Sequence, residues 1–180
     1  TWSVHSLTAG AVIDHREFFN EDSETTTDYN LFVAGRLDAT RNFQLTGQVS
    51  GGQNTEARYE PAGQGAPEPA RNQNIGAEIG VSYRSDRLLL QGTVGTRNSD
   101  YQNYYASRDM TDTYVGGRAS YAISPDVAIF ADVRQSDFEY DNSTVNRNGS
   151  QTNLRAGVSF ELVAPFRGEI SAGQVTDKRD

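Results

Sequence analysis

The stretch IGAEIGVSYRSDRLLLQGTVGTR (75–97) contains two runs in which apolar and polar residues alternate, joined by the short polar turn Ser85-Asp86-Arg87. Alternation with a period of two is typical of a β-strand with one apolar face. The same form recurs in YNLFVAGRLDATRNFQLTGQVSGG (29–52), TYVGGRASYAISPDVAIFADVRQS (113–136) and TNLRAGVSFELVAPFRGEISAGQ (152–174). The repeated unit is therefore an antiparallel hairpin, and its turns near residues 40, 86, 125 and 164 recur about every 40 residues.

The connections between these strands alternate in length. Short turns such as Ser124-Pro125-Asp126 and Ala164-Pro165 join the two strands of each hairpin. Long polar loops, expected near 18–28, 52–74, 98–112 and 137–151, join one hairpin to the next. With a leading strand from about Val4 to Glu17, the sequence predicts nine strands in a single domain over 1–180. Short turns on one side and long loops on the other are typical of an up-and-down transmembrane β-barrel.

The composition excludes several other classes. The chain has 16 basic and 24 acidic residues, a balance that argues against nucleic-acid binding. It has no cysteine and therefore no disulfide framework. No apolar run approaches the roughly 20 residues that a transmembrane helix needs. A mean hydropathy of −0.66 still suits a barrel, because only alternate strand residues face lipid.

Charged residues lie on the face opposite the Val, Leu, Ile and Ala positions. An arginine on the lipid side costs about 2–4 kcal/mol at mid-depth, so these residues are expected to line the lumen. Either they line a water-filled pore, or they pair into a network that plugs a narrow barrel; mixed charge that merely fills a polar lumen is the plainest alternative. The expected lumen residues are Arg16, Arg36, Asp38, Glu78, Arg84, Arg97, Arg118, Asp132, Arg134, Arg155, Glu161 and Glu169, with Asp14 and Arg167 beside them.

Barrel closure leaves three architectures open. Bacterial single-chain barrels normally have an even number of strands, and the sequence ends in TDKRD without a terminal aromatic residue. We therefore expect part of a larger barrel. An eight-stranded barrel without the first segment is the alternative. A soluble fold, either an antiparallel β-sandwich or a sheet with one face in water, is the third. For a barrel, an aromatic girdle is expected at the strand ends, from Tyr29, Phe43, Tyr83, Tyr121, Phe160 and Phe166.

Catalytic and metal-binding patterns are weak. The two histidines are His5 and His15, and Asp14 lies beside His15 on the opposite face of a strand. The acidic loop that begins at Asp137 lacks the spacing of a calcium loop. The sequence therefore predicts no catalytic residues, no cofactor and no metal. One loop carries Tyr101, Tyr104 and Tyr105, whose rings are suited either to binding sugars or a partner or to packing the loop itself.

The hairpins GVSYRSDRLLLQGTVGTRNSDY, GGRASYAISPDVAIFADVRQSDFEYD and LRAGVSFELVAPFRGEISAGQVTDKRD resemble a β-barrel porin family of Gram-negative outer membranes. The resemblance covers most of the chain after Asp28 and is a pattern more than a signature. It implies an outer-membrane barrel from a family often found beside surface-polysaccharide export genes. It brings no catalytic residues.

Together these observations predict a porin-like channel in a bacterial outer membrane, for small solutes or for polysaccharide export. Its expected partners are outer-membrane lipid, further barrel strands and other envelope proteins. A structural barrel with a plugged lumen, whose outer loops bind a partner, is the alternative function. A soluble β-sandwich binding module is the third.

Overall fold

The computed structural model describes residues 5–20, 24–56, 69–141, 147–163 and 166–179. It contains nine β-strands of 12 to 15 residues, longer than the 9–11 that cross a membrane at a tilt. These are β1 (His5–Arg16), β2 (Thr26–Asp38), β3 (Phe43–Thr55), β4 (Arg71–Ser85), β5 (Leu88–Tyr101), β6 (Met110–Ser124), β7 (Val127–Tyr140), β8 (Gly149–Val163) and β9 (Phe166–Arg179).

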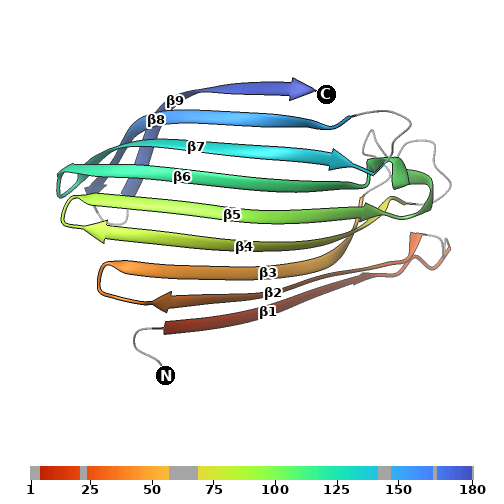
Figure 1. The fold of residues 1–180 in the computed structure, drawn as a ribbon. Helices are drawn as coiled ribbons and strands as arrows, with labels where there is room; N and C mark the ends of the chain where they lie inside the picture. Colours follow the sequence, from red (N-terminus) through yellow and green to blue (C-terminus); the bar gives the residue numbers. More distant parts are fainter. Residues whose placement is uncertain (1–4, 21–23, 57–68, 142–146, 164–165, 180) are drawn as a thin grey trace.

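All nine strands form one antiparallel sheet in sequence order, with β1 and β9 at its two edges (Figure 1). The predicted all-β, up-and-down architecture is confirmed. The eight-stranded alternative is wrong, because β1 pairs with β2 from His5 to Arg16. The β-sandwich alternative is also wrong, since a sandwich needs two packed sheets and the described strands all belong to one.

The strands run further into the loops than the sequence indicated. β3 continues through Thr55 and β4 begins at Arg71, so residues 56–70 connect them instead of 52–74. Likewise β5 ends at Tyr101 and β6 begins at Met110, and this connection contains the 3-10 helix η3 (Asn103–Arg108). Apart from Tyr101 and Met110, the extra strand residues are polar on both faces, so they carry no period-two signal. No helix in the described ranges is long and apolar enough to span a membrane.

The hairpin turns are as short as predicted where the structure describes them. Ser85 pairs with Leu88, which leaves two residues in the turn. Asp86 there has φ 37°, a left-handed conformation that aspartate tolerates better than most residues. Ser124 pairs with Val127 around a second turn of two residues. The turn predicted at Ala164-Pro165 lies outside the described residues.

The strand register joins the apolar positions into one continuous face. Val33 on β2 lies opposite both Ala9 on β1 and Val49 on β3. Further along the sheet, Ala131 on β7 lies opposite Ala119 on β6 and Ala156 on β8. Because a slip of one residue would move every side chain to the other face, this matching fixes the two faces of the sheet.

This apolar face is uncovered in the structure. Large side chains on it are strongly exposed, for example Leu7 at 69%, Ile79 at 60% and Ile170 at 70%. The buried hydrophobic residues among those described are Ala70, Tyr105, Tyr114 and Phe130, and none of them belongs to the apolar face. Exposed apolar area on this scale marks a surface that meets lipid or a partner.

Most of the expected girdle residues lie together at the short-turn end of the apolar face. Phe43 pairs directly with Tyr83, and Tyr121 pairs with Leu88 on the next strand. Phe160 lies at the start of the β8–β9 hairpin, opposite Gly168. Tyr29 is at the other end, near the long loops. An aromatic row at one rim of an apolar band resembles the interfacial girdle of membrane barrels.

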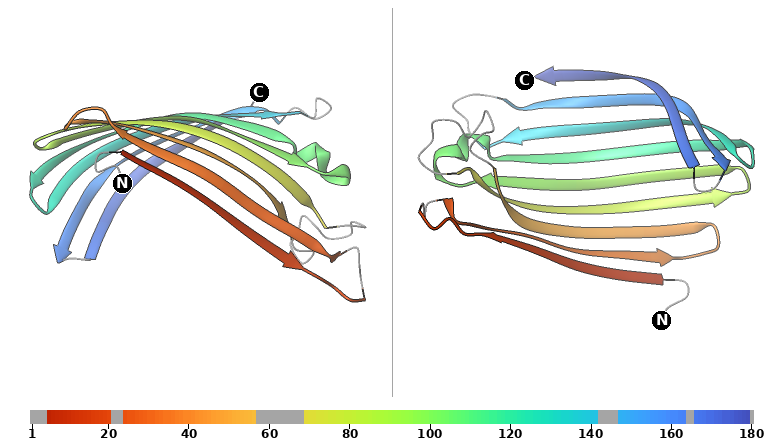
Figure 2. Two further views of the ribbon diagram at one scale, coloured as in Figure 1. Left: turned by 90° about the horizontal axis from the view of Figure 1, so that it is seen from below. Right: turned by 180° about the vertical axis from the view of Figure 1, so that it is seen from behind.

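The sheet is twisted and arched, as Figure 2 shows from below. On the polar face, Arg118 of β6 reaches Glu169 of β9 with 2.7 Å between Nη2 and Oε2. These strands are three spacings apart, about 14 Å at the usual separation. Their side chains therefore lean toward one another, as expected on the concave side of a curved sheet.

Candidate functional site

Every residue predicted to line a lumen lies on the polar face. The register places Arg118, Asp132 and Arg155 directly opposite one another on β6, β7 and β8. Alternation along each strand then puts the remaining members on the same face: Arg16, Arg36, Asp38, Glu78, Arg84, Arg97, Arg134, Glu161 and Glu169. We call this surface the charged wall.

Four of these residues form one ionic cluster. The Nη2 atom of Arg155 is 3.0 Å from Oδ2 of Asp132, and its Nη1 is 3.4 Å from Oε1 of Glu169. Arg118 contacts the same two carboxylates, at 3.7 Å for Asp132 and 2.7 Å for Glu169. Each arginine thus bridges two acids on different strands. The fixed fork of the guanidinium suits such a lattice better than the flexible ammonium of lysine.

An aromatic ring supports this ionic cluster. Phe130, which is 5% exposed, lies 3.7 Å beneath the guanidinium carbon of Arg118 and 5.6 Å from that of Arg155. The Phe130 ring extends over Gly157, the residue opposite it on β8. A Cβ on Gly157 would be 2.8 Å from this ring. The missing side chain of Gly157 therefore lets Phe130 lie flat on the wall and position both arginines above it.

A second unit of the same kind surrounds Tyr114 on β6. Its ring lies over Gly95 of β5, and its hydroxyl donates a 2.6 Å hydrogen bond to Glu78 of β4. The guanidinium of Arg134 stacks on the ring at 3.8 Å. Arginine, aromatic ring and opposing glycine recur in the same relation as around Phe130, whereas the carboxylate here binds the tyrosine hydroxyl instead of the arginine. This shared construction makes the wall between β4 and β9 an ordered surface.

The other predicted wall residues lie outside these two units. Three short local pairs occur near the strand ends: Arg16–Asp14 at 2.9 Å, Arg36–Asp38 at 3.3 Å and Arg167–Glu161 at 3.1 Å. Arg84 and Arg97 are exposed, and no carboxylate of the described residues lies within 4.0 Å of either guanidinium. Exposed pairs of this kind contribute about 0–1 kcal/mol each.

The predicted tyrosine cluster packs at the long-loop end. Tyr105 in η3 is 8% exposed and lies against Ala70 and Tyr101. The guanidinium of Arg108 stacks on the Tyr101 ring at 4.1 Å. Tyr101 and Tyr105 therefore both pack within the loop. The side chain of Tyr104 lies outside the described residues. Binding of sugars by these tyrosines stays a prediction.

An ion pair anchors η3 to the end of β3. Arg108 donates two hydrogen bonds of 2.8 Å to Glu56, and the hydroxyl of Tyr101 donates one of 3.1 Å to the same carboxylate. The hydrogen bond from Arg108 lowers the pKa of Glu56, against the opposing effect of burial. We call Glu56, Tyr101 and Arg108 the loop anchor.

The histidines and carboxylates in the described part of the chain form no site with a clear chemistry. His5 accepts a hydrogen bond from the Asp38 backbone, and His15 contacts Thr27 at the opposite end of β1. Asp100, Asp109 and Asp141 bring one oxygen each within 4.8 Å of the others. One oxygen of Asp109 already accepts the Tyr101 backbone N–H at 2.6 Å. Exposed carboxylates at this spacing are common without a metal, so the trio carries no assignment.

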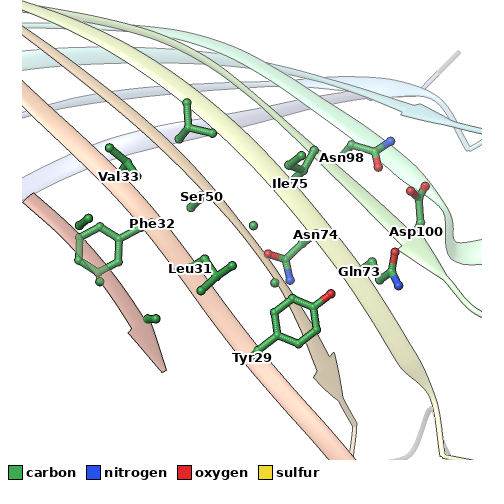
Figure 3. Close-up of a pocket in the computed structure, with 16 residues that line it drawn as sticks. Tyr29, Leu31, Phe32, Val33, Ser50, Gln73, Asn74, Ile75, Asn98 and Asp100 are labelled. Carbon is green, nitrogen blue, oxygen red and sulfur yellow. The ribbon is translucent and has the colours of Figure 1, made fainter. Parts of the chain in front are cut away.

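The apolar face has a hollow of about 810 Å³ over β1 to β5 (Figure 3). Leu31, Val33 and Ile75 line it, and the polar side chains of Asn98 and Asp100 gather at one side. It lies on the face opposite the charged wall, so it is not continuous with the ionic cluster.

Several wall residues that the structure brings together were not predicted from the sequence. Tyr114 and Ser136 lie on the same face as the predicted charges, and alternation alone could have placed them there. The roles of Gly95 and Gly157 depend on register, which hairpin turns of two residues partly determine. No sequence signal indicated the loop anchor, because Glu56 and Arg108 are 52 residues apart.

Comparison with known proteins agrees with this architecture. No curated protein matches the chain. A family match extends over residues 1–180, the whole chain, and carries the description "Putative beta-barrel porin 2". The nine-stranded up-and-down sheet, with one apolar face and one charged face, is the structure that a β-barrel wall requires. The chain belongs to this β-barrel porin family.

Proposed function

We propose that this chain forms the wall of a channel in a bacterial outer membrane, with the apolar face in lipid and the charged wall toward water. The observation that carries the proposal is the register, which separates all twelve predicted charges from a continuous apolar face over nine strands. In lipid, each arginine of the wall would cost about 2–4 kcal/mol. Facing water, the same residues are solvated or paired.

The arrangement of charge favours a lined passage over a plugged one. Arg118 and Arg155 pair with carboxylates on neighbouring parts of the same wall, so the ionic cluster lies along the surface. Such lateral pairs leave the space in front of the wall to solvent. Small polar solutes, or a polysaccharide chain during export, are the cargo that this hydrophilic surface suits.

The proposed orientation places the short turns in the periplasm and the long loops outside the cell. The aromatic residues at the short-turn end, including Tyr83 and Tyr121, then lie at the inner interface of the membrane. Outer-membrane lipid contacts the apolar hollow around Leu31 and Ile75. Other envelope proteins are proposed to bind at the loop side.

Planar-bilayer conductance of the purified protein tests this function. Ohmic single-channel steps are expected, with a conductance that rises with salt concentration. The absence of steps over many verified insertions would contradict a channel. It would favour a structural barrel, with a plugged lumen and loops that bind a partner.

A further inference from the structure

We propose that the charged wall contains a binding site for small oxyanions, such as a carboxylate or phosphate group of a solute. The site is a hollow of about 260 Å³ between β5 and β8. Its polar lining consists of Gln91, Thr93, Arg118, Asp132, Arg134 and Arg155. The inference rests on the proposed channel for solute access, and it adds the chemical class of solute that the wall retains.

The local charge is positive because one arginine has no acidic partner. Arg118 and Arg155 share Asp132 and Glu169, so these four residues balance. Arg134 forms no ion pair within 4.0 Å among the described residues. These five residues, three arginines and two carboxylates, therefore have a surplus of one positive charge. It is carried by a group that stays protonated at every physiological pH.

Arg134 is held in place from below. Its guanidinium stacks on Tyr114 at 3.8 Å, and its Nε donates to the hydroxyl of Ser136 at 3.5 Å. Tyr114 is 8% exposed and Ser136 is 6% exposed, so both supports are fixed in the wall. The two Nη groups of Arg134 are not used by these contacts. A planar oxyanion accepts two parallel hydrogen bonds from such a fork, and a preorganised fork loses less entropy on binding.

The opposite side of the hollow offers neutral donors. Thr93 on β5 is separated from Arg134 by Gly116, in one row across three strands. Because Gly116 has no side chain, no side chain projects between Thr93 and Arg134; a Cβ there would lie only 3.2 Å from Oγ1 of Thr93 and 3.4 Å from the Val133 carbonyl oxygen. Gln91 lies beside Thr93 on the same face. Hydroxyl and amide groups can complete the hydrogen bonding of an anion bound to Arg134.

The carboxylate of Asp132 is the only acidic group in the lining of this hollow, and its charge is compensated. Arg155 contacts it at 3.0 Å and Arg118 at 3.7 Å. An anion at Arg134 therefore meets a neutral pair beside it instead of a bare carboxylate. Elsewhere on the wall, Arg84 and Arg97 stack on no ring of the described residues, and neither lines this hollow.

The test measures binding in detergent micelles, without any conduction. Acetate and inorganic phosphate are titrated separately while the Nε–Hε resonances of the arginines are followed by NMR. Saturable shifts of the Arg134 resonance are expected with both probes. Arg134→Gln replaces the charged guanidinium with a neutral amide. Read from the remaining Arg118 and Arg155 resonances, binding of both anions should weaken by at least about fivefold. The matched control is Arg84→Gln, because Arg84 on β4 is also a wall arginine without an ion pair among the described residues. This control should leave the affinity for both anions unchanged.

A second variant separates charge from space. Gly116→Val fills the hollow without altering any charge, so it should also weaken anion binding. It takes the place of Arg134→Gln in the test if Arg134→Gln fails to fold. Non-saturable shifts, or equal loss in Arg134→Gln and Arg84→Gln, would overturn the site. Saturation by phosphate alone would overturn a general oxyanion site. Because micelle binding does not need a conducting pore, a silent bilayer recording with saturable binding would refute the channel and leave the site intact.

Discussion

The ring of Tyr114 on β6 lies directly over Gly95 on β5, and so reaches Glu78 one strand further on. A Cβ at Gly95 would be 2.5 Å from Cζ of Tyr114 and 2.9 Å from the Ala77 carbonyl oxygen. The glycine is therefore needed for the aromatic residue to lie flat, and the same relation joins Gly157 to Phe130. An aromatic ring covering an opposing glycine is a known way to stabilise β-sheets.

Gly95→Ala should displace Tyr114 and break its hydrogen bond to Glu78. We expect the free energy of unfolding to fall by about 1–3 kcal/mol, the usual cost of overpacking. Urea unfolding in micelles measures it. The control is Gly47→Ala, because the nearest atom to a Cβ there is 4.0 Å away; it should change stability by less than about 0.5 kcal/mol. Equal effects of the two substitutions would show that the ring does not depend on Gly95.

Substitutions on the two faces of the sheet should differ in their effect on assembly. Val94 and Ile129 lie on the apolar face, and Thr93 lies on the charged wall. Val94→Arg and Ile129→Arg should block assembly in the membrane, because each places a charge in lipid at about 2–4 kcal/mol. Thr93→Arg should assemble. The folded fraction is read from heat-dependent gel mobility, and equal yields of all three variants would refute the assignment of the faces.

Arg118 and Glu169 should be energetically coupled although they lie on strands three apart. Their 2.7 Å contact is partly exposed, with 26% and 32% of the side chains accessible. A double-mutant cycle with Arg118→Met and Glu169→Gln should give a coupling of about 0.5–2 kcal/mol that decreases in high salt. A coupling of zero would mean that the two side chains do not meet in the folded protein.

The loop anchor should weaken in acid. The Arg108 hydrogen bond lowers the pKa of Glu56 in the folded protein, so folding favours the charged carboxylate. This stabilisation is fully present above the unfolded pKa, near the ordinary value of 4.5, and is lost as the pH falls through the lowered folded value. The protection factors of the η3 amides, which compare each exchange rate with that of an unstructured peptide at the same pH, should therefore fall below about pH 4.5.

Glu56→Gln is the control for this pH dependence. The glutamine cannot titrate, so the protection factors of the η3 amides should already be low at neutral pH and change little between neutral and acidic solution. If protection in the variant still fell in acid as in the native protein, another group would be responsible.

The faces of this sheet could be predicted because alternation is a local property of each strand. Val33 and Arg36, for example, are assigned to opposite faces by their spacing alone. The strand ends were placed less well, since residues 51–55 continue β3 without an apolar side chain to mark their face. A polar segment has the same composition whether it pairs in a sheet or forms a loop. Only the presence of a partner strand distinguishes the two cases.

Contacts between distant strands could not be predicted. The ionic cluster joins β6 to β9, and the loop anchor joins the end of β3 to η3. Both depend on how strongly the sheet curves, which brings side chains together across strands that are not hydrogen-bonded to each other. Alternation places Arg118 and Glu169 on one face but gives no distance between them. The burial of Tyr105 could not be predicted either, because it packs against Ala70, which lies in another connection.

The central claim is that one face of this sheet meets lipid while the other meets water, and spin labels along β5 test it most directly. The chain has no cysteine, so single cysteines at residues 90 to 94 can each be labelled without background. In lipid bilayers, labels at Leu90, Gly92 and Val94 should collide mainly with oxygen. Labels at Gln91 and Thr93 should collide mainly with a water-soluble nickel chelate. Uniform accessibility along the strand, or the opposite alternation, would contradict a membrane-spanning wall with the charged face toward water.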